Sequence, residues 1–226
     1  MSKILKEALS NFSDRIEDSI KTKKNILVTT HIDCDGLTSG SIITKALIRA
    51  GAKCTVRTTN EFNHSLIEKM QKETRDLHVI TDLGGGFGKE LNEKLGDNWL
   101  ILDHHEIPDD EIDNNKVINA WKFGFDGGSE ICAGGMTYLA AVELQKENKD
   151  LSALAIISAL GDRQDQGEKK SFTGKMLEIV KTAQNLGLVE IDLDLLLVGR
   201  ETRPLPDALA FTSQPFIEGL TWNRSA

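Results

Sequence analysis

The sequence is poor in cysteine and proline and has no long apolar run. Its three cysteines are far apart with no C-x-x-C pair, which argues against a disulfide framework and against a zinc knuckle. With only four prolines, 19 scattered glycines and 39% hydrophobic residues, the 226-residue chain is neither collagenous nor disordered. The composition is that of an ordinary globular protein, long enough for one domain or for one domain plus a fragment.

Membrane and secretory signals are also absent from the sequence. The longest apolar stretches, such as residues 151–160, fall short of the roughly 20 residues that cross a bilayer. The first residues lack the apolar core and the small-residue cleavage site of a secretory signal. The sequence therefore predicts a cytoplasmic protein with no membrane partner.

Positive charge is scarce, because 27 Lys and Arg residues face 35 Asp and Glu residues, for a net charge of −8. Nonspecific affinity for nucleic acid comes from neutralising phosphates with Lys and Arg, so this balance argues against a simple duplex-binding domain. Trp99, Trp121 and Trp222 are too dispersed to predict a base-stacking platform. Any contact with nucleic acid must be local, metal-assisted or supplied by another domain.

Apolar runs and helical periodicities alternate along the first half of the chain. Apolar spacings of three and four residues predict a helix in the first twenty residues, and others over 39–50 and 65–72. Short β-branched or apolar runs predict strands over 25–30, 53–58, 77–81 and 99–102, with residues 31–36 as a turn. Helices are expected again over 136–146, 151–160 and 172–186. This order predicts an α/β fold: a doubly wound, mainly parallel sheet with a helical continuation.

Titratable residues gather where the predicted strands end. The motif H-x-D-x-D-G follows the first strand, Asp82 ends the third, Asp103 with two histidines ends the fourth, and Asp162 follows a helix. Ligands of open parallel sheets bind beyond the carboxyl ends of the strands. Carboxylate and imidazole groups suit a divalent metal such as manganese, and four carboxylates would balance two such ions. The residues that we expect to meet there are His31, Asp33, Asp35, Asp82, His104 and Asp162.

Each of these residues also has an ordinary structural interpretation. An aspartate after a strand is often a helix N-cap, and Asp82 or Asp162 alone would be interpreted in that way. His104 and His105 alone would be loop or core residues satisfied by hydrogen bonds. The occurrence of all of them at strand ends favours the metal site.

Taken together, residues 31–36, Asp82, Asp103-His104-His105 and Gly161-Asp162 resemble, in order, the four motifs of the DHH phosphoesterase superfamily. Within it the chain most resembles the archaeal RecJ-like exonucleases, because residues 123–131, 133–135 and 202–217 are similar to segments of that group. The resemblance covers most of the chain.

The resemblance implies two metal ions, usually manganese, with magnesium as the alternative. His31 and Asp33 would hold one ion, and Asp35, His104 and Asp162 the other. Asp82 would bridge the two ions and, with His105, form the catalytic pair. The remaining implied roles concern the surroundings of the ions: Asp103 orients a histidine, and the substrate contacts come from His105, Arg163, Gly134 and Gly135. A solvated arginine and a plain helix entry are the alternative interpretations of Arg163 and of the two glycines.

The resemblance also bears on domain organisation. Residues 1–190 are predicted to form the DHH domain with its helical part. Residues 191–226 are predicted to be a C-terminal extension, irregular from residue 200 onward because of its prolines. Family nucleases carry a second domain that closes over the cleft, and its glycine-rich motif is not found in this sequence. The extension is therefore expected to lead to a missing or absent second domain.

The leading functional hypothesis is a metal-dependent phosphodiesterase, an exonuclease of RecJ type on single-stranded DNA or RNA in replication or repair. One alternative is a small substrate such as a short oligonucleotide, a cyclic dinucleotide or pyrophosphate. The single residue between His31 and Asp33 favours the RecJ-like branch, because pyrophosphatases of the superfamily place three residues there. An alternative of a different class is a replisome component that binds the GINS and MCM helicase assembly with little catalysis.

Overall fold

The computed structural model describes residues 2–108, 116–193 and 195–225. It contains two compact units, Met1–Val189 and Glu190–Ala226. Each unit is described by itself below. The predicted boundary between a DHH domain and a C-terminal extension at residue 190 stays a prediction.

A five-stranded sheet forms the centre of the first unit. Its strands are β1 (Asn25–His31), β2 (Lys53–Thr59), β3 (Leu77–Thr81), β4 (Trp99–Asp103) and β5 (Val117–Asn119). They lie in the order β2-β1-β3-β4-β5, and every neighbouring pair is parallel. The predicted doubly wound parallel sheet is therefore confirmed. The strand order reverses between β1 and β3, and in such sheets ligands bind beyond the carboxyl ends of the strands at this point.

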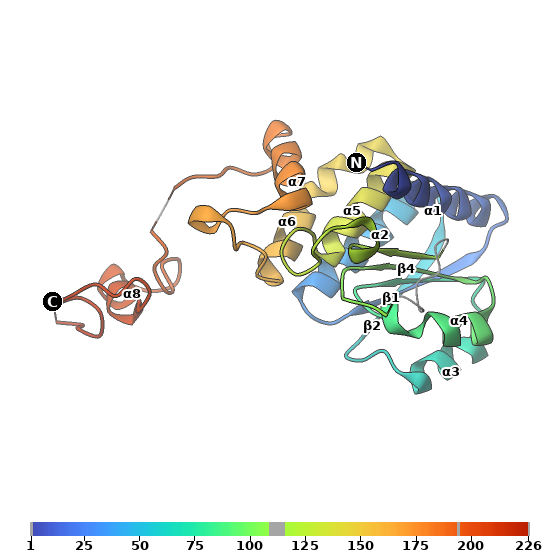
Figure 1. Ribbon diagram of the computed structural model, residues 1–226, viewed down its shortest axis with the longest axis horizontal. Coiled ribbons are helices and arrows are strands. Elements are labelled where there is room, and N and C mark those ends of the chain that lie inside the picture. The colour runs from blue at the N-terminus through green and yellow to red at the C-terminus, as the bar shows by residue number, and fades with distance from the viewer. Residues whose placement is uncertain (1, 109–115, 194, 226) are drawn as a thin grey trace. The chain divides into compact units, whose positions relative to one another are not determined.

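Helices cover both faces of the sheet (Figure 1). On one face lie α1 (Lys3–Lys21), α2 (Cys34–Arg49) and α5 (Ala133–Leu144), and on the other lie α3 (His64–Lys72) and α4 (Gly88–Leu95). Side chains alternate along each strand, so Leu100 and Leu102 join the core under α1, α2 and α5, while Trp99 and Ile101 join the core under α3 and α4. The helical continuation was predicted over 136–146, 151–160 and 172–186. The first of these helices is α5, which packs on the sheet, and the other two are α6 (Ser152–Gly161) and α7 (Gly174–Asn185). Short 3-10 helices lie at 85–87, 121–123, 146–151 and 168–170.

Two local features of the first unit differ from the sequence-based expectation. Residues 31–36 were expected to form a turn, yet α2 already begins at Cys34. The reason is a helix cap: the carboxylate of Asp33 accepts a hydrogen bond from the Gly36 N–H at 2.8 Å and so satisfies a free donor of the first turn. The helix α4 was not expected, because Leu91 is its one buried side chain with apolar character and gives no periodic signal.

The second unit contains α8 (Leu205–Phe211) in a segment expected to be irregular. Its prolines lie at the start of the helix, where a missing N–H costs nothing and the fixed φ favours helix. Thr212 links α8 to the segments before and after it. Its hydroxyl accepts a hydrogen bond from the Val198 N–H and donates one to the Ala208 carbonyl, and its own carbonyl accepts one from the Thr221 hydroxyl. Within the described ranges, no helix has the length and apolar content needed to cross a membrane.

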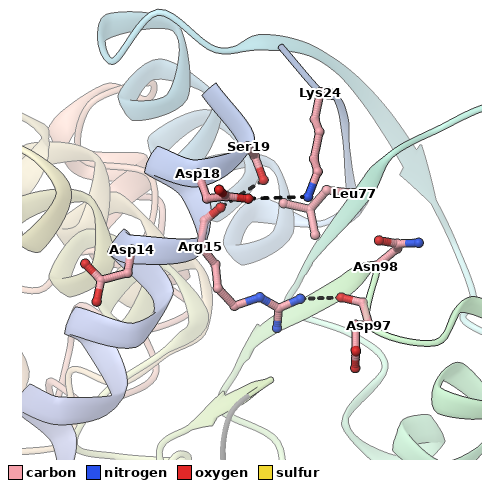
Figure 2. Close-up of a pocket in the computed structure, with 8 residues that line it drawn as sticks. All are labelled: Asp14, Arg15, Asp18, Ser19, Lys24, Leu77, Asp97 and Asn98. Atoms are coloured by element: carbon pink, nitrogen blue, oxygen red, sulfur yellow. Dashed lines mark hydrogen bonds and ion pairs between the residues drawn. The ribbon is translucent and has the colours of Figure 1, made fainter. Parts of the chain in front are cut away.

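A polar pocket of about 250 Å³ lies at the amino ends of the strands (Figure 2). Lys24 precedes β1, Leu77 begins β3 and Asn98 precedes β4, so this pocket is at the edge of the sheet opposite to the predicted metal site. Both of its cationic side chains already have partners within it: Lys24 pairs with Asp18 at 3.6 Å, and Arg15 donates to the Asp97 carbonyl. We therefore assign this pocket no part in the chemistry below.

A buried histidine makes the stability of the first unit sensitive to acid. His78 lies on β3 opposite Trp99 and is 1% exposed. Burial, together with the positive charge of Arg57, lowers the pKa of His78 to about 4. The unfolded chain, with a pKa near 6.5, binds more protons between these values, so stability is complete above pH 6.5 and falls toward pH 4.

Between pH 7 and pH 5, we expect the unfolding free energy of the wild type to fall by about 2 kcal/mol more than that of His78→Leu. Urea unfolding of both proteins at the two pH values measures this difference. An equal loss in wild type and His78→Leu would show that His78 is not the acid-sensitive group.

Candidate metal centre

The parallel register brings three titratable residues side by side. Thr30 of β1 pairs with Thr81 of β3, which pairs with Leu102 of β4. The next residue on each strand is therefore His31, Asp82 or Asp103, in one row at the carboxyl edge of the sheet. Side chains from the start of α2 and from the end of α6 reach the same edge. The six predicted ligand residues meet here, in overlapping groups whose ligand atoms lie within 4.8 Å of one another.

The first group contains His31, Asp33 and Asp82. His31 Nδ1 lies 2.8 Å from Asp33 Oδ2 and 3.7 Å from Asp82 Oδ2. Burial alone would raise the pKa of Asp33, but the Gly36 N–H and His31 outweigh it and lower this pKa. The glycine is required because a Cβ at position 36 would lie 2.5 Å from the His31 carbonyl oxygen.

The second group contains Asp35, His104 and Asp162. His104 Nε2 lies 3.4 Å from Asp35 Oδ2, and its Nδ1 lies 3.7 Å from Asp162 Oδ2. Asp35 is fixed by the entry of α5, because its carboxylate accepts the Ala133 N–H at 2.9 Å and the Gly134 N–H at 2.8 Å. The hydroxyl of Ser158 on α6 lies within hydrogen-bond distance of the same carboxylate. Backbone donors thus hold a buried carboxylate in the first turn of α2.

A backbone carbonyl sets the orientation of His104. Its Nδ1 lies 2.7 Å from the Gly127 carbonyl, which can only accept, so Nδ1 carries the hydrogen. The other nitrogen, Nε2, then faces Asp82 Oδ1 at 3.3 Å. Gln164 donates to the same carbonyl at 2.7 Å and to Asp162 Oδ2 at 3.1 Å. Gly127 and Gln164 therefore hold both His104 and Asp162 in place.

Asp82 lies between the two groups. It is 2% exposed, has a positive φ of 61°, and its Oδ2 has no hydrogen-bond partner among the described residues. Burial, and the negative charge of Asp35, raise the pKa of Asp82 to about 7 although His104 opposes the shift. A buried carboxylate oxygen without a donor is costly unless a cation approaches it. The donor set of carboxylates and imidazoles fits such a cation.

The contact between Asp82 and His104 also changes the pKa of His104. Burial would lower the pKa of His104, but its hydrogen bond to Asp82 and the charge of Asp35 outweigh burial and raise the pKa to about 10. A cation between Asp82 and His104 would take the place of the proton on Nε2. Binding of a metal here is therefore expected to release protons.

Asp103 and His105 form a separate pair at the edge of the site. Asp103, 1% exposed, lies 2.9 Å from His105 Nδ1 and also accepts the backbone N–H of His104 at 2.8 Å. The hydrogen bond between the Asp103 carboxylate and the His105 ring raises the pKa of His105, whose side chain is 58% exposed. Burial would raise the pKa of Asp103, but His105 outweighs it and lowers this pKa. The pair places the His105 ring at a pocket of about 420 Å³ that Asp82 and Asp103 also line.

The structure gives the predicted substrate contacts different surroundings. Gly134 is buried and donates its N–H to Asp35, which leaves no free donor for a phosphate at this position. Gly135 is buried as well, between Ile131 and Met176. Arg163 is exposed directly after Asp162, and its predicted contact with substrate stays a prediction.

Sequence reasoning missed three residues that hold the ligands: Gly127, Gln164 and Ser158. Gly127 lies within the glycine-containing segment on which the family resemblance rests, but that pattern does not indicate a carbonyl directed at His104. A Cβ at Gly127 would lie 1.8 Å from the His104 carbonyl oxygen, which explains why glycine is needed. Gln164 and Ser158 flank Asp162 at distances of two and four residues, and this proximity is the one signal that points to them.

Comparison with known proteins places the chain among related sequences. It is 34% identical over 201 residues to an uncharacterized protein of Methanocaldococcus jannaschii, covering 86% of this chain and 45% of that protein. It is 26% identical over 198 residues to the single-stranded-DNA-specific exonuclease RecJ of Bacillus subtilis, covering 82% of this chain and 25% of that protein. The chain thus spans less than half the length of these relatives.

Solved structures share the fold. An exonuclease RecJ bound to manganese matches with a TM-score of 0.65 and 20% identity, over 82% of this chain and 48% of that one. CDC45 from Entamoeba histolytica matches with a TM-score of 0.63 and 18% identity, over 92% of this chain and 46% of that one.

A sequence model described as the DHH family, N-terminal domain, matches residues 25–161. This range contains the whole sheet and five of the six residues that meet at its edge, and the sixth, Asp162, follows directly. With the fold, the ordered motifs and more than half of the sequence in agreement, the chain belongs to the DHH family of phosphoesterases.

Proposed function

We propose that this chain is a two-metal phosphodiesterase domain that hydrolyses single-stranded nucleic acid from an end, in DNA replication or repair. The observation that carries the proposal is the position of the buried Asp82 carboxylate, between His31 and Asp33 on one side and His104, grouped with Asp35 and Asp162, on the other. One of its oxygens has no hydrogen-bond donor among the described residues. Sequence similarity to the Bacillus subtilis RecJ exonuclease supports the choice of substrate.

The two oxygens of Asp82 face different groups, which supports a bridging role. Oδ2 lies on the side of His31, and Oδ1 lies on the side of His104. His31 and Asp33 would hold one ion, and Asp35, His104 and Asp162 the other. Four carboxylates balance two divalent cations. We propose Mn²⁺, as in the RecJ structure solved with manganese, and Mg²⁺ as the alternative.

The side chains around the ions have separable tasks. Ions held there would lower the pKa of water and neutralise charge developing on the phosphoryl group. His105, which Asp103 orients and whose pKa it raises, would in its protonated form donate a hydrogen bond to a phosphoryl oxygen as negative charge grows. His105 and Asp82 line the same pocket, which allows both to act on one phosphate. No side-chain nucleophile is required by this arrangement.

A second candidate function is assembly with replicative helicase components such as GINS and MCM. The likeness to CDC45 favours it, although at 18% identity this likeness concerns the fold alone. The complete set of candidate ligands favours catalysis over a purely structural role. Small substrates, such as short oligonucleotides and cyclic dinucleotides, are the remaining alternative within the same chemistry.

Metal binding should be visible in the stability of the protein. At a Mn²⁺ concentration about 100-fold above its Kd, we expect the unfolding temperature of the wild type to rise on the order of 5–10 °C, because only the folded state holds the ions. Asp82→Asn should lose most of this rise. Without metal it should be at least as stable as wild type, because a neutral amide replaces a buried carboxylate.

Differential scanning calorimetry with chelator, Mn²⁺ and Mg²⁺ measures these effects. The matched control is Asp14→Asn, an exposed aspartate at the opposite edge of the sheet, which should respond to metal like wild type. A wild-type protein that neither ion stabilises would contradict the metal centre.

Activity should follow the same residues. With Mn²⁺ we expect shortening of end-labelled single-stranded DNA or RNA, a loss of about a hundredfold or more in Asp82→Asn, and a smaller loss in His105→Asn, which removes one hydrogen bond to the phosphate. A panel with single-stranded DNA, single-stranded RNA, a cyclic dinucleotide and pyrophosphate measures the substrate specificity.

Cleavage of pyrophosphate alone would refute the nuclease assignment. Capture of GINS and MCM by a protein that cleaves nothing would favour the assembly role.

A further inference from the structure

A pocket of about 420 Å³ adjoins the metal centre and shares Asp82, Asp103 and His105 with it. We call it the side pocket. Its other walls come from the segment after β2, from the turn before α4 and from the residues after β4, and they include Glu61, Phe62, Gly84, Phe87 and Glu106. A group attached to a phosphate at Asp82 and His105 can therefore lie against these walls.

One wall of the side pocket is aromatic. The rings of Phe62 and Phe87 are both partly buried, with centroids 5.4 Å apart and planes tilted by 58°. Gly84 lies beside the Phe62 ring and has a φ of 87°, a conformation that favours glycine. Aromatic rings that line a pocket next to a phosphate site are the surface on which nucleobases stack.

The charge of the side pocket excludes a second anion. Four of its lining residues are acidic, Glu61, Asp82, Asp103 and Glu106, and none of the described lining residues is Lys or Arg. The ions of the proposed metal centre would offset the charge of Asp82, so Glu61 and Glu106 keep the outer part of the pocket negative. A phosphate away from the ions would be repelled here, whereas a neutral ring that carries hydrogen-bond donors matches the wall. Carboxylates accept hydrogen bonds from exocyclic amino groups of bases.

We propose that the side pocket binds the nucleobase of the nucleotide whose phosphate lies at the metal centre, and that it prefers bases with an exocyclic amino group. Phe62 and Phe87 provide the stacking surface, and Glu61 and Glu106 accept from the amino group. This inference rests on the proposed function, and it names the part of the substrate that the site distinguishes.

Deoxycytidine and deoxyuridine monophosphates give a matched pair of probes, because they differ by an amino group in place of a carbonyl oxygen. Isothermal titration calorimetry on the full 226-residue chain with Mn²⁺ measures both. We expect deoxycytidine monophosphate to bind about tenfold more tightly, as for a hydrogen bond to a charged acceptor. Both should bind more tightly than 2-deoxyribose 5-phosphate, which has no base to stack.

The double variant Glu61→Gln with Glu106→Gln should reduce this preference to within about twofold. Both glutamates are exposed, so folding is not at risk. The matched control is Glu68→Gln with Glu93→Gln, which changes the net charge equally at exposed helical positions outside the pocket and should keep the tenfold preference.

Equal binding of the two nucleotides by wild type, or an unchanged preference in the Glu61 and Glu106 variant, overturns the inference. Binding of the base-free sugar phosphate as tight as that of both nucleotides overturns it as well. Failure of the proposed function gives a different result. A wild type that discriminates the nucleotides but cleaves no phosphodiester keeps the side pocket and loses the nuclease, whereas cleavage without discrimination does the reverse.

Discussion

The site depends on the burial of the Asp82 carboxylate where the parallel strands end. Every neighbouring carboxylate in the described part of the site has a donor from the protein: Gly36 for Asp33, the entry of α5 for Asp35, the backbone of His104 for Asp103, and Gln164 for Asp162. Asp82 differs, because its Oδ2 has no such donor. The surrounding donors therefore stabilise an arrangement in which one oxygen of the central carboxylate is left for a proton or a cation.

Close backbone approach makes this convergence possible. At Gly36, Gly127 and Gly134, a Cβ would lie 2.5 Å or less from His31, His104 and Ser158 respectively, so a side chain at any of them would displace a residue of the site. Gly127 lies in the connection from the sheet to α5 and Gly134 in the first turn of α5, both far in sequence from the H-x-D-x-D-G motif. The connection and the start of α5 thus serve as a second support for ligands that the other elements supply.

The strand ends and the ligand-type residues could be predicted from sequence, because a parallel sheet places the carboxyl ends of its strands at one edge. The supports could not be predicted. Nothing in a glycine-containing segment indicates that the Gly127 carbonyl meets His104, or that the Gly134 N–H meets Asp35 instead of a phosphate. These contacts depend on loop paths that no periodicity encodes. The start of α2 at Cys34 was missed for a related reason: Asp33 has the pattern of a ligand and of an N-cap, and its two oxygens face His31 and Gly36.

His104 and His105 are adjacent in sequence, and their acceptors separate their chemistry. A carbonyl accepts from Nδ1 of His104, which directs Nε2 of a buried ring at Asp82 and Asp35, where a cation can replace its proton. A carboxylate accepts from His105, which raises the pKa of an exposed ring and keeps it a donor at the pocket. A carbonyl in place of Asp103 would remove the charge that favours the protonated form of His105. Either kind of acceptor at Nδ1 of His104 would leave Nε2 free for a cation, so it is the burial of this ring beside Asp82 and Asp35 that suits it to a metal. The position of Asp103 therefore suits His105 to a phosphate, and the carboxylates that face Nε2 suit His104 to a metal.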